Sequence, residues 1–295
     1  MLFRSPLLEV GRFRARPADR HFRCSGPPGQ HVFVFPRTSV RIRHAGAEPF
    51  VTDRELVTFY NPHQLYFREA VSPAGDECDW LSLRPDVVEE VAVEADPRVE
   101  PGSPEPFRHA RGPCDGTSYL MQRALLAAIA GGRSPEAGFL EETAVELLAR
   151  LLRAASGSRR GGREPTGFAA RRRRELAEAA RARVALRYDR DESLDDVARD
   201  LGCSVGHLCR SFRGHVGRTL HGHRNELRLR AALDQLPDSR RHLSRLALEL
   251  GYASHSHFTA AFRRRFGATP DWLRRHGTLR GVRRLLEAPA TGAAA

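Results

Sequence analysis

Lysine does not occur in this sequence, so arginine alone supplies its 48 basic side chains. We attribute this absence to a GC-rich genome and not to function. Long apolar runs are missing too, because no segment approaches the ~18 residues that span a membrane. The opening stretch MLFRSPLLEVGRFRARP reaches its arginines too early for a secretory signal. We therefore expect a cytoplasmic protein with no membrane partner.

Cysteine is scarce and scattered, with five residues and no CxxC pair. The odd number and wide spacing fit free thiols in a reducing compartment better than a disulfide framework. The residues are Cys24, Cys78, Cys114, Cys203 and Cys209. The first three, with His21, could form a thiolate metal or redox site, but such thiols are more often small buried apolar groups. We expect no catalytic site, metal or cofactor, and keep the cysteine site as an alternative.

Charge is distributed unevenly along the chain. Residues 1–150 hold 18 arginines against 21 acidic residues, whereas residues 151–295 hold 30 arginines against 15 acidic residues. The whole formal excess of +12 therefore lies in the second half. A basic half joined to a near-neutral half predicts a polyanion-binding domain tied to a domain that does not touch the anion.

The first hundred residues are rich in β-branched and aromatic runs separated by turn residues. A regular spacing of such runs is typical of an antiparallel barrel or sandwich. The predicted strands are HVFVFP (31–36), TSVRIRH (38–44), ELVTFY (55–60), QLYFREAV (64–71) and WLSL (80–83), followed by a short helix over 85–95.

Helical periodicity begins after residue 116. Residues 117–131 and 135–155 are both predicted to be helices, and leucines and alanines at spacings of three and four give the second a broad apolar stripe. That stripe either covers the sheet or pairs with its copy in a homodimer. A polar, glycine-rich linker follows, and from Phe168 onward the pattern is helical throughout.

The second half contains an internal repeat. LDDVARDLGCSVGHLCRSFRGHVGRT, from Leu194, aligns with LSRLALELGYASHSHFTAAFRRRFGAT, from Leu243, with one extra residue in the turn of the second copy. Each copy has a short amphipathic helix, a glycine that permits a left-handed helix end, a serine suited to cap the next helix, and a second helix. This order predicts two helix-turn-helix units, whose second helices present their first residues to the DNA major groove.

The polar residues of the stretch GYASHSHFTAAFRRRFGATPDWLRR are predicted to face DNA. Phe258 and Phe262 lie four residues apart and mark the buried side of a helix, so the polar side chains point away from the core. A metal site at His255 and His257 is disfavoured because residues two apart lie on different sides of a helix and no cysteine or carboxylate is close in sequence.

The last hundred residues resemble the DNA-binding domain of the AraC/XylS transcriptional regulators. The stretch from Gly251 to Arg275 matches the signature of the second unit, and SVGHLCRSFRGHVGRTLHGHRNELRLRAAL matches the first unit and a connecting helix of about 220–235. The resemblance implies two recognition helices in successive major grooves, with Gly206, Cys209 and Arg210 at reading positions in the first unit. In the second unit it implies His255, Ser256, Thr259 and Ala260.

We predict a DNA-contact set from both units. Arg210 can make the bidentate contact to guanine, whereas the arginines later in each recognition helix suit phosphate contacts or solvent. Gly206 has no side chain with which to read a base, and Ala260 stands where an arginine is common in the family. The set is Ser204, His207, Cys209, Arg210, Arg213, Ser254, His255, Ser256, Thr259, Arg263 and Arg264.

The same family implies a cupin-like β-barrel that binds an effector or a partner. The first half lacks the HxH histidine pair of metal-dependent cupins, which argues against an oxygenase. As an effector site we predict Arg37, Tyr60, Gln64, Tyr66 and Arg68, although a purely structural role for these residues is an alternative. The predicted domains are a cupin-like β domain (1–110), a helical and possibly dimerising connector (111–156), a linker (157–168), an AraC-type domain (169–280) and a flexible tail (281–295).

The sequence thus predicts an α+β protein, with a barrel, a helical connector and a double helix-turn-helix domain. It is expected to be a transcription regulator and not an enzyme. Its predicted partners are double-stranded promoter DNA, RNA polymerase, a small-molecule effector and a second copy of the chain. Two alternatives remain: a cysteine-based redox, metal or alkyl-acceptor activity in the first half, and a ligand-independent regulator whose first half binds another protein.

Overall fold

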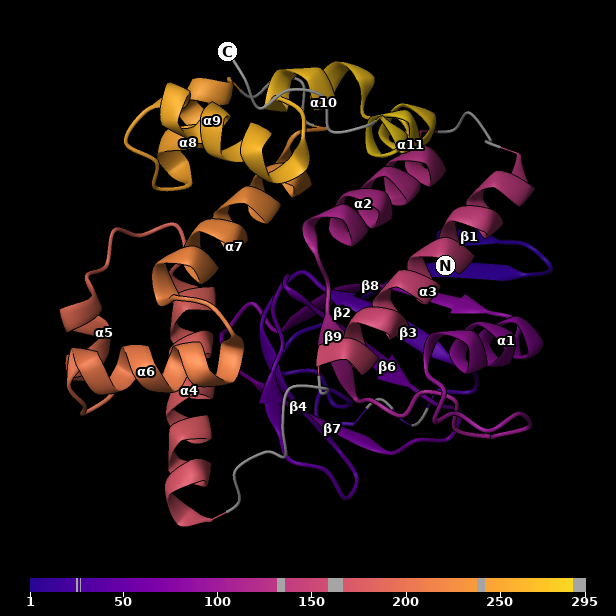
Figure 1. Ribbon diagram of the computed structural model, residues 1–295, viewed down its shortest axis with the longest axis horizontal. Helices are drawn as coiled ribbons and strands as arrows, with labels where there is room; N and C mark the ends of the chain where they lie inside the picture. Colours follow the sequence, from indigo (N-terminus) through magenta and orange to yellow (C-terminus); the bar gives the residue numbers. More distant parts are fainter. Residues whose placement is uncertain (25, 27, 132–135, 159–166, 238–241, 289–295) are drawn as a thin grey trace.

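The computed structural model describes residues 1–24, 26, 28–131, 136–158, 167–237 and 242–288. It has a β domain, three helices that pack on it, and a helical C-terminal domain that lies against the β domain and those helices (Figure 1). The α+β fold class predicted from the sequence is confirmed.

The β domain consists of two antiparallel sheets. The six-stranded sheet runs β1 (Phe3–Arg4), β2 (Leu8–Ala15), β8 (Asp76–Leu83), β3 (Val32–Pro36), β6 (Leu56–Tyr60) and β9 (Arg111–Pro113). The three-stranded sheet runs β5 (Phe50–Val51), β4 (Val40–His44) and β7 (Tyr66–Ala70). All five predicted strands form. The sequence analysis missed β1, β2, the short β5 and β9, the last of which it assigned to the connector.

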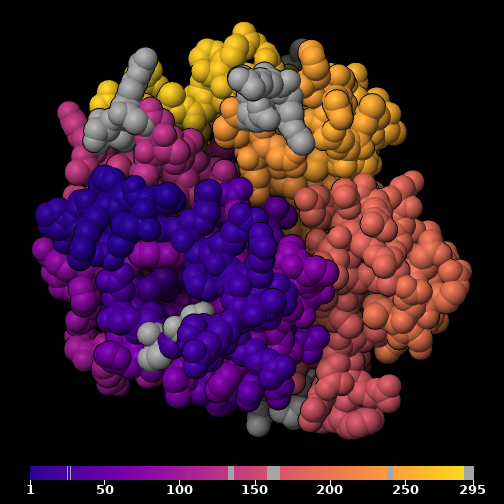
Figure 2. All heavy atoms as spheres, turned by 180° about the vertical axis from the view of Figure 1, so that it is seen from behind, coloured from indigo at the N-terminus to yellow at the C-terminus, as the bar shows by residue number. Residues whose placement is uncertain are grey.

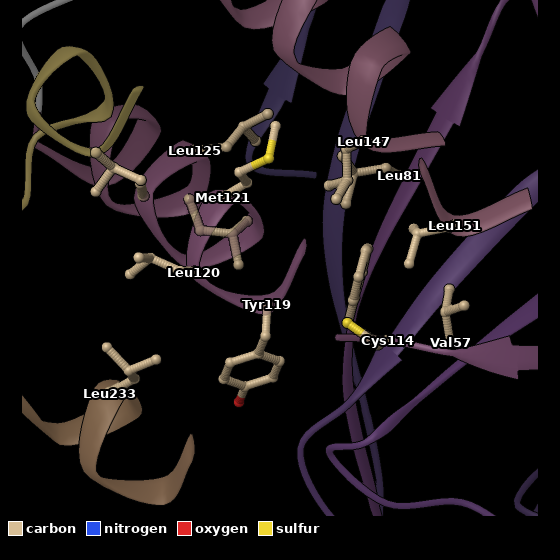
Figure 3. Close-up of a cluster of buried hydrophobic side chains, with 14 of the residues drawn as sticks. Val57, Leu81, Cys114, Tyr119, Leu120, Met121, Leu125, Leu147, Leu151 and Leu233 are labelled. Carbon is tan, nitrogen blue, oxygen red and sulfur yellow. The ribbon is translucent and has the colours of Figure 1, made fainter. Parts of the chain in front are cut away.

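Three helices cover the face of the large sheet that points away from the small one. They are α1 (Pro85–Ala95), α2 (Gly116–Ala130) and α3 (Ala137–Ser158). Leu147 and Leu151 of α3 are fully buried and belong to one apolar cluster with Val57 and Leu81 of the sheet and Met121 of α2 (Figure 3). The stripe predicted on this helix therefore packs within the chain.

The C-terminal domain has eight helices within its described residues. They are α4 (Phe168–Leu186), α5 (Leu194–Asp200), α6 (Val205–Val216), α7 (Leu220–Gln235), α8 (Leu243–Glu249), α9 (His255–Phe266), α10 (Pro270–His276) and α11 (Leu279–Glu287). We call α5–α6 the first unit and α8–α9 the second unit. The long helix α7 connects them, with the bounds predicted from the sequence (Figure 1).

Two boundaries differ from prediction. The flexible tail expected from residue 281 is wrong as far as residue 287, because Leu279 and Val282 are buried and fix α11 against α2. The linker predicted over 157–168 lies mostly outside the described residues, and its two ends belong to α3 and α4.

The two units are attached to the rest of the protein by different kinds of contact. Buried side chains of α7 to α11, such as Leu233, Phe266 and Val282, are continuous with the apolar cluster under the large sheet. The first unit has its own apolar cluster with α4 and the start of α7, centred on Leu208 and Phe212. The first unit therefore meets the β domain mainly through polar groups.

Candidate nucleic-acid interface and ligand cavity

The recognition helices α6 and α9 begin and end in the same way. The backbone N–H of His207 donates to the Ser204 hydroxyl at 3.3 Å, and that of His257 donates to the Ser254 hydroxyl at 3.1 Å. Both helices end at a glycine with positive φ, Gly217 and Gly267. The turn before each helix also contains a glycine with positive φ, Gly202 or Gly251. Each serine thus satisfies a free N–H at the helix start, as predicted from the repeat.

The buried and exposed faces of these helices agree with the predicted orientation. Leu208, Phe212, Phe258 and Phe262 are all fully buried. The exposed residues of the predicted DNA set are Ser204, His207, Arg210 and Arg213 in the first unit and Ser254, His255, Ser256, Arg263 and Arg264 in the second. Cys209 and Thr259 are half-buried, so they reach the surface only in part.

Arg210 lies over the glycine that precedes it by one helical turn. Its guanidinium Nη1 would be 3.3 Å from a Cβ added at Gly206. The missing side chain at this reading position therefore leaves space for the arginine that we expect to read a base. This relation links two residues that the sequence analysis treated separately.

Arg265 differs from its two exposed neighbours. Its Nε donates to Glu226 on α7 at 2.5 Å, and its guanidinium packs against Gly116 at the start of α2. The sequence analysis grouped it with Arg263 and Arg264 as a phosphate partner or solvated residue. The structure shows that Arg265 instead joins the second unit to α7 and to the first half of the chain.

A cavity of about 500 Å³ lies between the two sheets of the β domain. Figure 2 shows the β domain hollowed on the face opposite to that of Figure 1. The lining is largely apolar and aromatic, from both sheets: Phe13, Val32, Val34, Val40, Ile42, Tyr60, Tyr66 and Trp80. One buried ion pair interrupts it, with Arg68 Nε 2.6 Å from Asp76 Oδ2. Burial raises the pKa of Asp76 despite the guanidinium beside it.

Three of the five residues predicted for effector binding line this cavity, namely Tyr60, Tyr66 and Arg68. Gln64 does not, because its amide contacts His44 Nδ1 at 3.2 Å and accepts from the backbone of Asn61. Arg37 points to a smaller pocket between the β domain and α4, and lies 3.5 Å from Asp79. These two residues do not belong to the cavity wall.

The cysteines of the first half do not come together. Cys78 lines the cavity from β8, Cys114 lies under α2, and Cys24 is half-buried in a loop. Burial raises the pKa of Cys78 well above its usual range and that of Cys114 to about 12. Thiolates are therefore strongly disfavoured at both positions. Within the described residues no three His, Cys, Asp or Glu side chains are placed to hold a metal ion.

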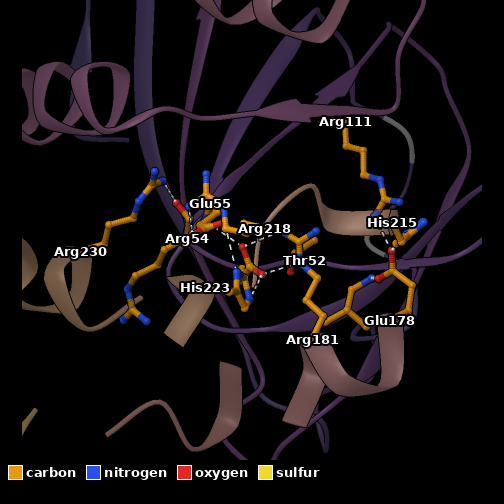
Figure 4. A network of polar contacts seen from close by, with 12 residues as sticks. Thr52, Arg54, Glu55, Arg111, Glu178, Arg181, His215, Arg218, His223 and Arg230 are labelled. Atoms are coloured by element: carbon orange, nitrogen blue, oxygen red, sulfur yellow. Dashed lines mark hydrogen bonds and ion pairs between the residues drawn. The ribbon is translucent and has the colours of Figure 1, made fainter. Parts of the chain in front are cut away.

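A short acidic loop of the β domain contacts the C-terminal domain. This acidic loop, residues 52–55, connects β5 to β6 (Figure 4). Asp53 forms a two-point ion pair with Arg181 of α4, with distances of 2.5 Å and 3.0 Å. Glu55 accepts from Arg218, which follows the C-cap of α6, at 2.8 Å. No role for this loop was predicted from the sequence.

The acidic loop also encloses a histidine of α7. His223 is fully buried, with Nε2 3.4 Å from Asp53 Oδ2 and Nδ1 3.1 Å from Glu55 Oε2. Burial opposes protonation of the ring, but the two carboxylates outweigh burial and raise the pKa of His223. Burial likewise opposes ionisation of Asp53, yet Arg181 and His223 hold the pKa of that carboxyl well below its usual range.

A second polar group, centred on Glu178 of α4, lies beside the acidic loop. Its carboxylate accepts from the backbone N–H of Val51 at 3.0 Å and from Arg111 of β9 at 3.0 Å, and it contacts His215 of α6 at 2.9 Å. Burial opposes ionisation, but these partners lower the pKa of Glu178 to about 2. The contact of the β domain with α4 and the end of the first unit is therefore a network of ion pairs around three buried carboxylates, Asp53, Glu55 and Glu178 (Figure 4).

Across the described residues, no helix has both the length and the apolar character needed to cross a bilayer.

Comparison with known proteins identifies the C-terminal domain. Residues 197–276 match the family described as "Helix-turn-helix domain". The transcriptional regulator GlxA of Rhizobium meliloti is 40% identical over 79 residues, which are 27% of this chain and 24% of GlxA. The regulatory protein SoxS of Escherichia coli strain K12 is 35% identical over 83 residues, which are 28% of this chain and 78% of SoxS.

The whole chain also has a distant structural likeness to ToxT of Vibrio cholerae, solved with an unsaturated fatty acid bound. The two share 12% identity with a TM-score of 0.36, over 93% of this chain and 97% of that chain. The named relatives of the C-terminal domain are regulatory proteins and not enzymes. Because most of SoxS aligns at this level of identity with the two units described above, the chain belongs to the AraC/XylS family of transcriptional regulators.

Proposed function

We propose that this regulator reads promoter DNA with the exposed faces of α6 and α9, and that a small ligand in the β-domain cavity controls it. The observation that carries the first part is the shared geometry of the two recognition helices. Each has a capped N-terminus, two fully buried apolar side chains four residues apart (Leu208 and Phe212, or Phe258 and Phe262) and exposed polar residues near its start. Those first residues are the ones that a helix-turn-helix unit presents to base edges.

The exposed residues divide into two roles by their chemistry. Arg210 lies in the second turn of α6 and has room over Gly206, so it is placed to make a bidentate contact with guanine. Arg263 and Arg264 lie in the last turns of α9, far from the reading end, and suit phosphates. Base reading in the second unit then depends on His255, Ser256 and the half-buried Thr259.

The cavity indicates the chemical class of the ligand. Its walls are apolar and aromatic, and its volume of about 500 Å³ is in the range of small-molecule sites. The buried Arg68–Asp76 pair supplies charged donors and an acceptor, and the other polar residues of the lining are Arg4, Glu9, Gln30, Thr52 and Thr58. A mainly apolar molecule with one polar end fits this lining best, and Tyr60 and Tyr66 would bracket it.

The remaining partners follow from the family and not from a contact in this chain. We propose that the protein works in the cytoplasm, binds DNA as a homodimer and contacts RNA polymerase at its promoters. The apolar stripe of α3 packs within the chain, so a dimer would use another surface.

The test of DNA binding is a salt series with the purified protein. Its own upstream intergenic DNA is compared with scrambled DNA of the same length. Tight binding to the upstream fragment alone at physiological salt supports the proposal. Equal binding to both fragments, with a steep salt dependence, would mean only nonspecific attraction to phosphates and would contradict it.

The test of ligand binding is a thermal shift screen against a metabolite library, because a molecule that binds only the folded state raises its melting temperature. Trp80 lines the cavity and provides a second readout through its fluorescence. A hit that stabilises the protein and also changes Trp80 emission supports the cavity as the site. Stabilisation that persists when Val34 is replaced by Trp to fill the cavity would place the ligand elsewhere.

A further inference from the structure

The two units are held to the rest of the protein by contacts of different character. The second unit shares an apolar cluster with α2 and α3, including Phe266 of α9 and Leu233 of α7. The first unit packs on α4, and charges attach this part to the β domain: Asp53 and Val51 pair with Arg181 and Glu178 of α4, and Glu55 pairs with Arg218 just after α6. A buried ion pair that loses one partner leaves the other charge uncompensated, which is strongly destabilising, so such a contact is sensitive to the position of each carboxylate.

The acidic loop lies at the centre of that ionic contact. Within four residues it contacts the helix before the first unit through Asp53–Arg181, the end of α6 through Glu55–Arg218, and α7 through His223. Arg54, between the two carboxylates, donates to Asp234 of α7 at 2.9 Å.

The loop also begins in the wall of the ligand cavity. Thr52 lines the cavity, and its hydroxyl joins β5 to β4 by accepting from the Val40 N–H and donating to the Val40 carbonyl, both at 3.1 Å. The next residue is Asp53. Thr52 and Asp53 are joined by one peptide bond. A molecule that displaces Thr52 therefore also moves the Asp53 carboxylate that holds Arg181.

We propose that the acidic loop is an autoinhibitory clasp, which holds the first unit against the β domain and opens when the cavity wall at Thr52 moves. This inference rests on the proposed DNA binding and the proposed ligand cavity, and adds how one acts on the other. The clasped state binds DNA more weakly for two reasons. Glu55 neutralises Arg218 next to the recognition helix, and the clasp restricts how the first unit can adjust to the groove.

The experiment compares Asp53→Asn and Glu55→Gln with wild type, in the full chain and without ligand. The matched control is Glu69→Gln, which removes one charge from an exposed carboxylate on β7 that pairs only weakly with Arg41 and does not touch the C-terminal domain. We expect both clasp variants to bind the upstream DNA at least about fivefold tighter, a modest value for allosteric coupling. Glu69→Gln should bind like wild type.

Thr52→Val tests the link to the cavity. It keeps the side-chain volume but removes the two side-chain hydrogen bonds to Val40 and leaves only the backbone bond from the Thr52 N–H to the Val40 carbonyl at 2.8 Å, so the loop should loosen without any change of charge. We expect Thr52→Val to bind DNA more tightly than wild type, with a smaller gain in affinity than Asp53→Asn shows. A Thr52→Val protein that binds DNA like wild type would overturn the link between cavity and clasp.

The opening of the clasp can also be followed without any substitution. The Val51 N–H donates to Glu178 across the contact, so its hydrogen exchange reports whether the two domains are joined. Because coupling between sites is reciprocal, upstream DNA should speed exchange in the peptide that contains Val51. This measurement on wild type tests whether DNA binding opens the clasp, even if a clasp variant fails to fold.

The outcomes separate this inference from the proposed function. If wild type does not distinguish upstream from scrambled DNA, the proposed function fails. If wild type binds specifically but Asp53→Asn and Glu55→Gln bind equally well or more weakly, only the clasp is overturned. Slower or unchanged Val51 exchange on adding DNA overturns it as well.

Discussion

Arg181 of α4 and Asp53 of the acidic loop form a two-point ion pair in which both side chains are almost wholly shielded from solvent, at 6% and 1% exposure. Neither group can find water while the domains stay together. Their pairing therefore ties α4, on which the first unit packs, to the acidic loop of the β domain.

Replacing Arg181 by Met should weaken this contact strongly. Removing one partner of a buried pair leaves the other charge uncompensated, a loss of about 3–5 kcal/mol in the free energy of unfolding. The domains should also separate more readily, because separation lets water hydrate the unpaired Asp53 carboxylate. Urea unfolding of the full chain measures the change.

The control for that prediction is Arg171→Met. Arg171 pairs with Glu175 on the exposed start of the same helix, and such pairs contribute less than about 1 kcal/mol. If the two variants lose the same free energy of unfolding, the Arg181 pair has no special role.

Stability should fall with rising pH through His223. Asp53 and Glu55 raise the pKa of this buried ring above its ordinary value of 6.5. The protonated ring therefore stabilises the contact fully below pH 6.5, and the stabilisation is lost as pH rises through the raised pKa. Arg181 and Arg218, which share the same carboxylates, keep their charge throughout.

The measurement is urea unfolding of wild type and His223→Gln from about pH 6 to about pH 9. The difference in unfolding free energy between them should be largest at the acidic end and shrink toward the alkaline end. A difference that is constant, or that grows with pH, would show that His223 is neutral in the folded protein.

The sequence was most informative where structure is local. The helix-turn-helix repeat, its capping serines and its left-handed glycines depend on residues a few positions apart, and α6, α7 and α9 formed where the pattern placed them. The pair Phe258 and Phe262 of the second unit is buried, as its spacing predicted.

The sequence was least informative where residues distant in the chain meet. Asp53 and Arg181 are separated by 128 positions, and nothing in VTDREL distinguishes its carboxylates from those of any exposed turn. Strand β2 was overlooked because LEVGRFRA has arginines and a glycine in place of a continuous apolar run. Gly11 leaves room for Trp80 on the neighbouring strand β8. This requirement cannot be seen in the local sequence.

Gly11 provides a test of the cavity wall. It lies opposite Trp80 in the β2–β8 register, and a Cβ added there would overlap the indole ring. Gly11→Ala should push Trp80 into the cavity and destabilise the protein by about 1–3 kcal/mol, as is usual for overpacking.

Acrylamide quenching of tryptophan fluorescence follows that displacement. The quenching of Trp80 should change in Gly11→Ala, whereas Trp272 on α10 supplies a constant background. Gly138→Ala is a suitable comparison, because a Cβ at that helical position meets no atom within 4 Å. Unchanged quenching and stability in Gly11→Ala would mean that the sheet can shift to accept the added methyl group.

The predicted division of labour between arginines can be tested by two alanine substitutions. Arg210 is exposed in the second turn of α6 beside Gly206, where base edges are read, so Arg210→Ala should lose about 1–3 kcal/mol of discrimination between the upstream DNA and single-base variants of it. Arg264 is exposed near the end of α9, so Arg264→Ala should weaken binding to every sequence alike and reduce the salt dependence by about one phosphate contact.

Affinities for upstream and scrambled DNA, each measured at several salt concentrations, distinguish the two roles. Arg210→Ala should bring the two affinities closer together, whereas Arg264→Ala should lower both and preserve their ratio. An equal loss on both DNAs for Arg210→Ala would assign this residue to the phosphate backbone. Base reading in the first unit would then fall to His207 and the half-buried Cys209, whose side chains are shorter and less selective for guanine.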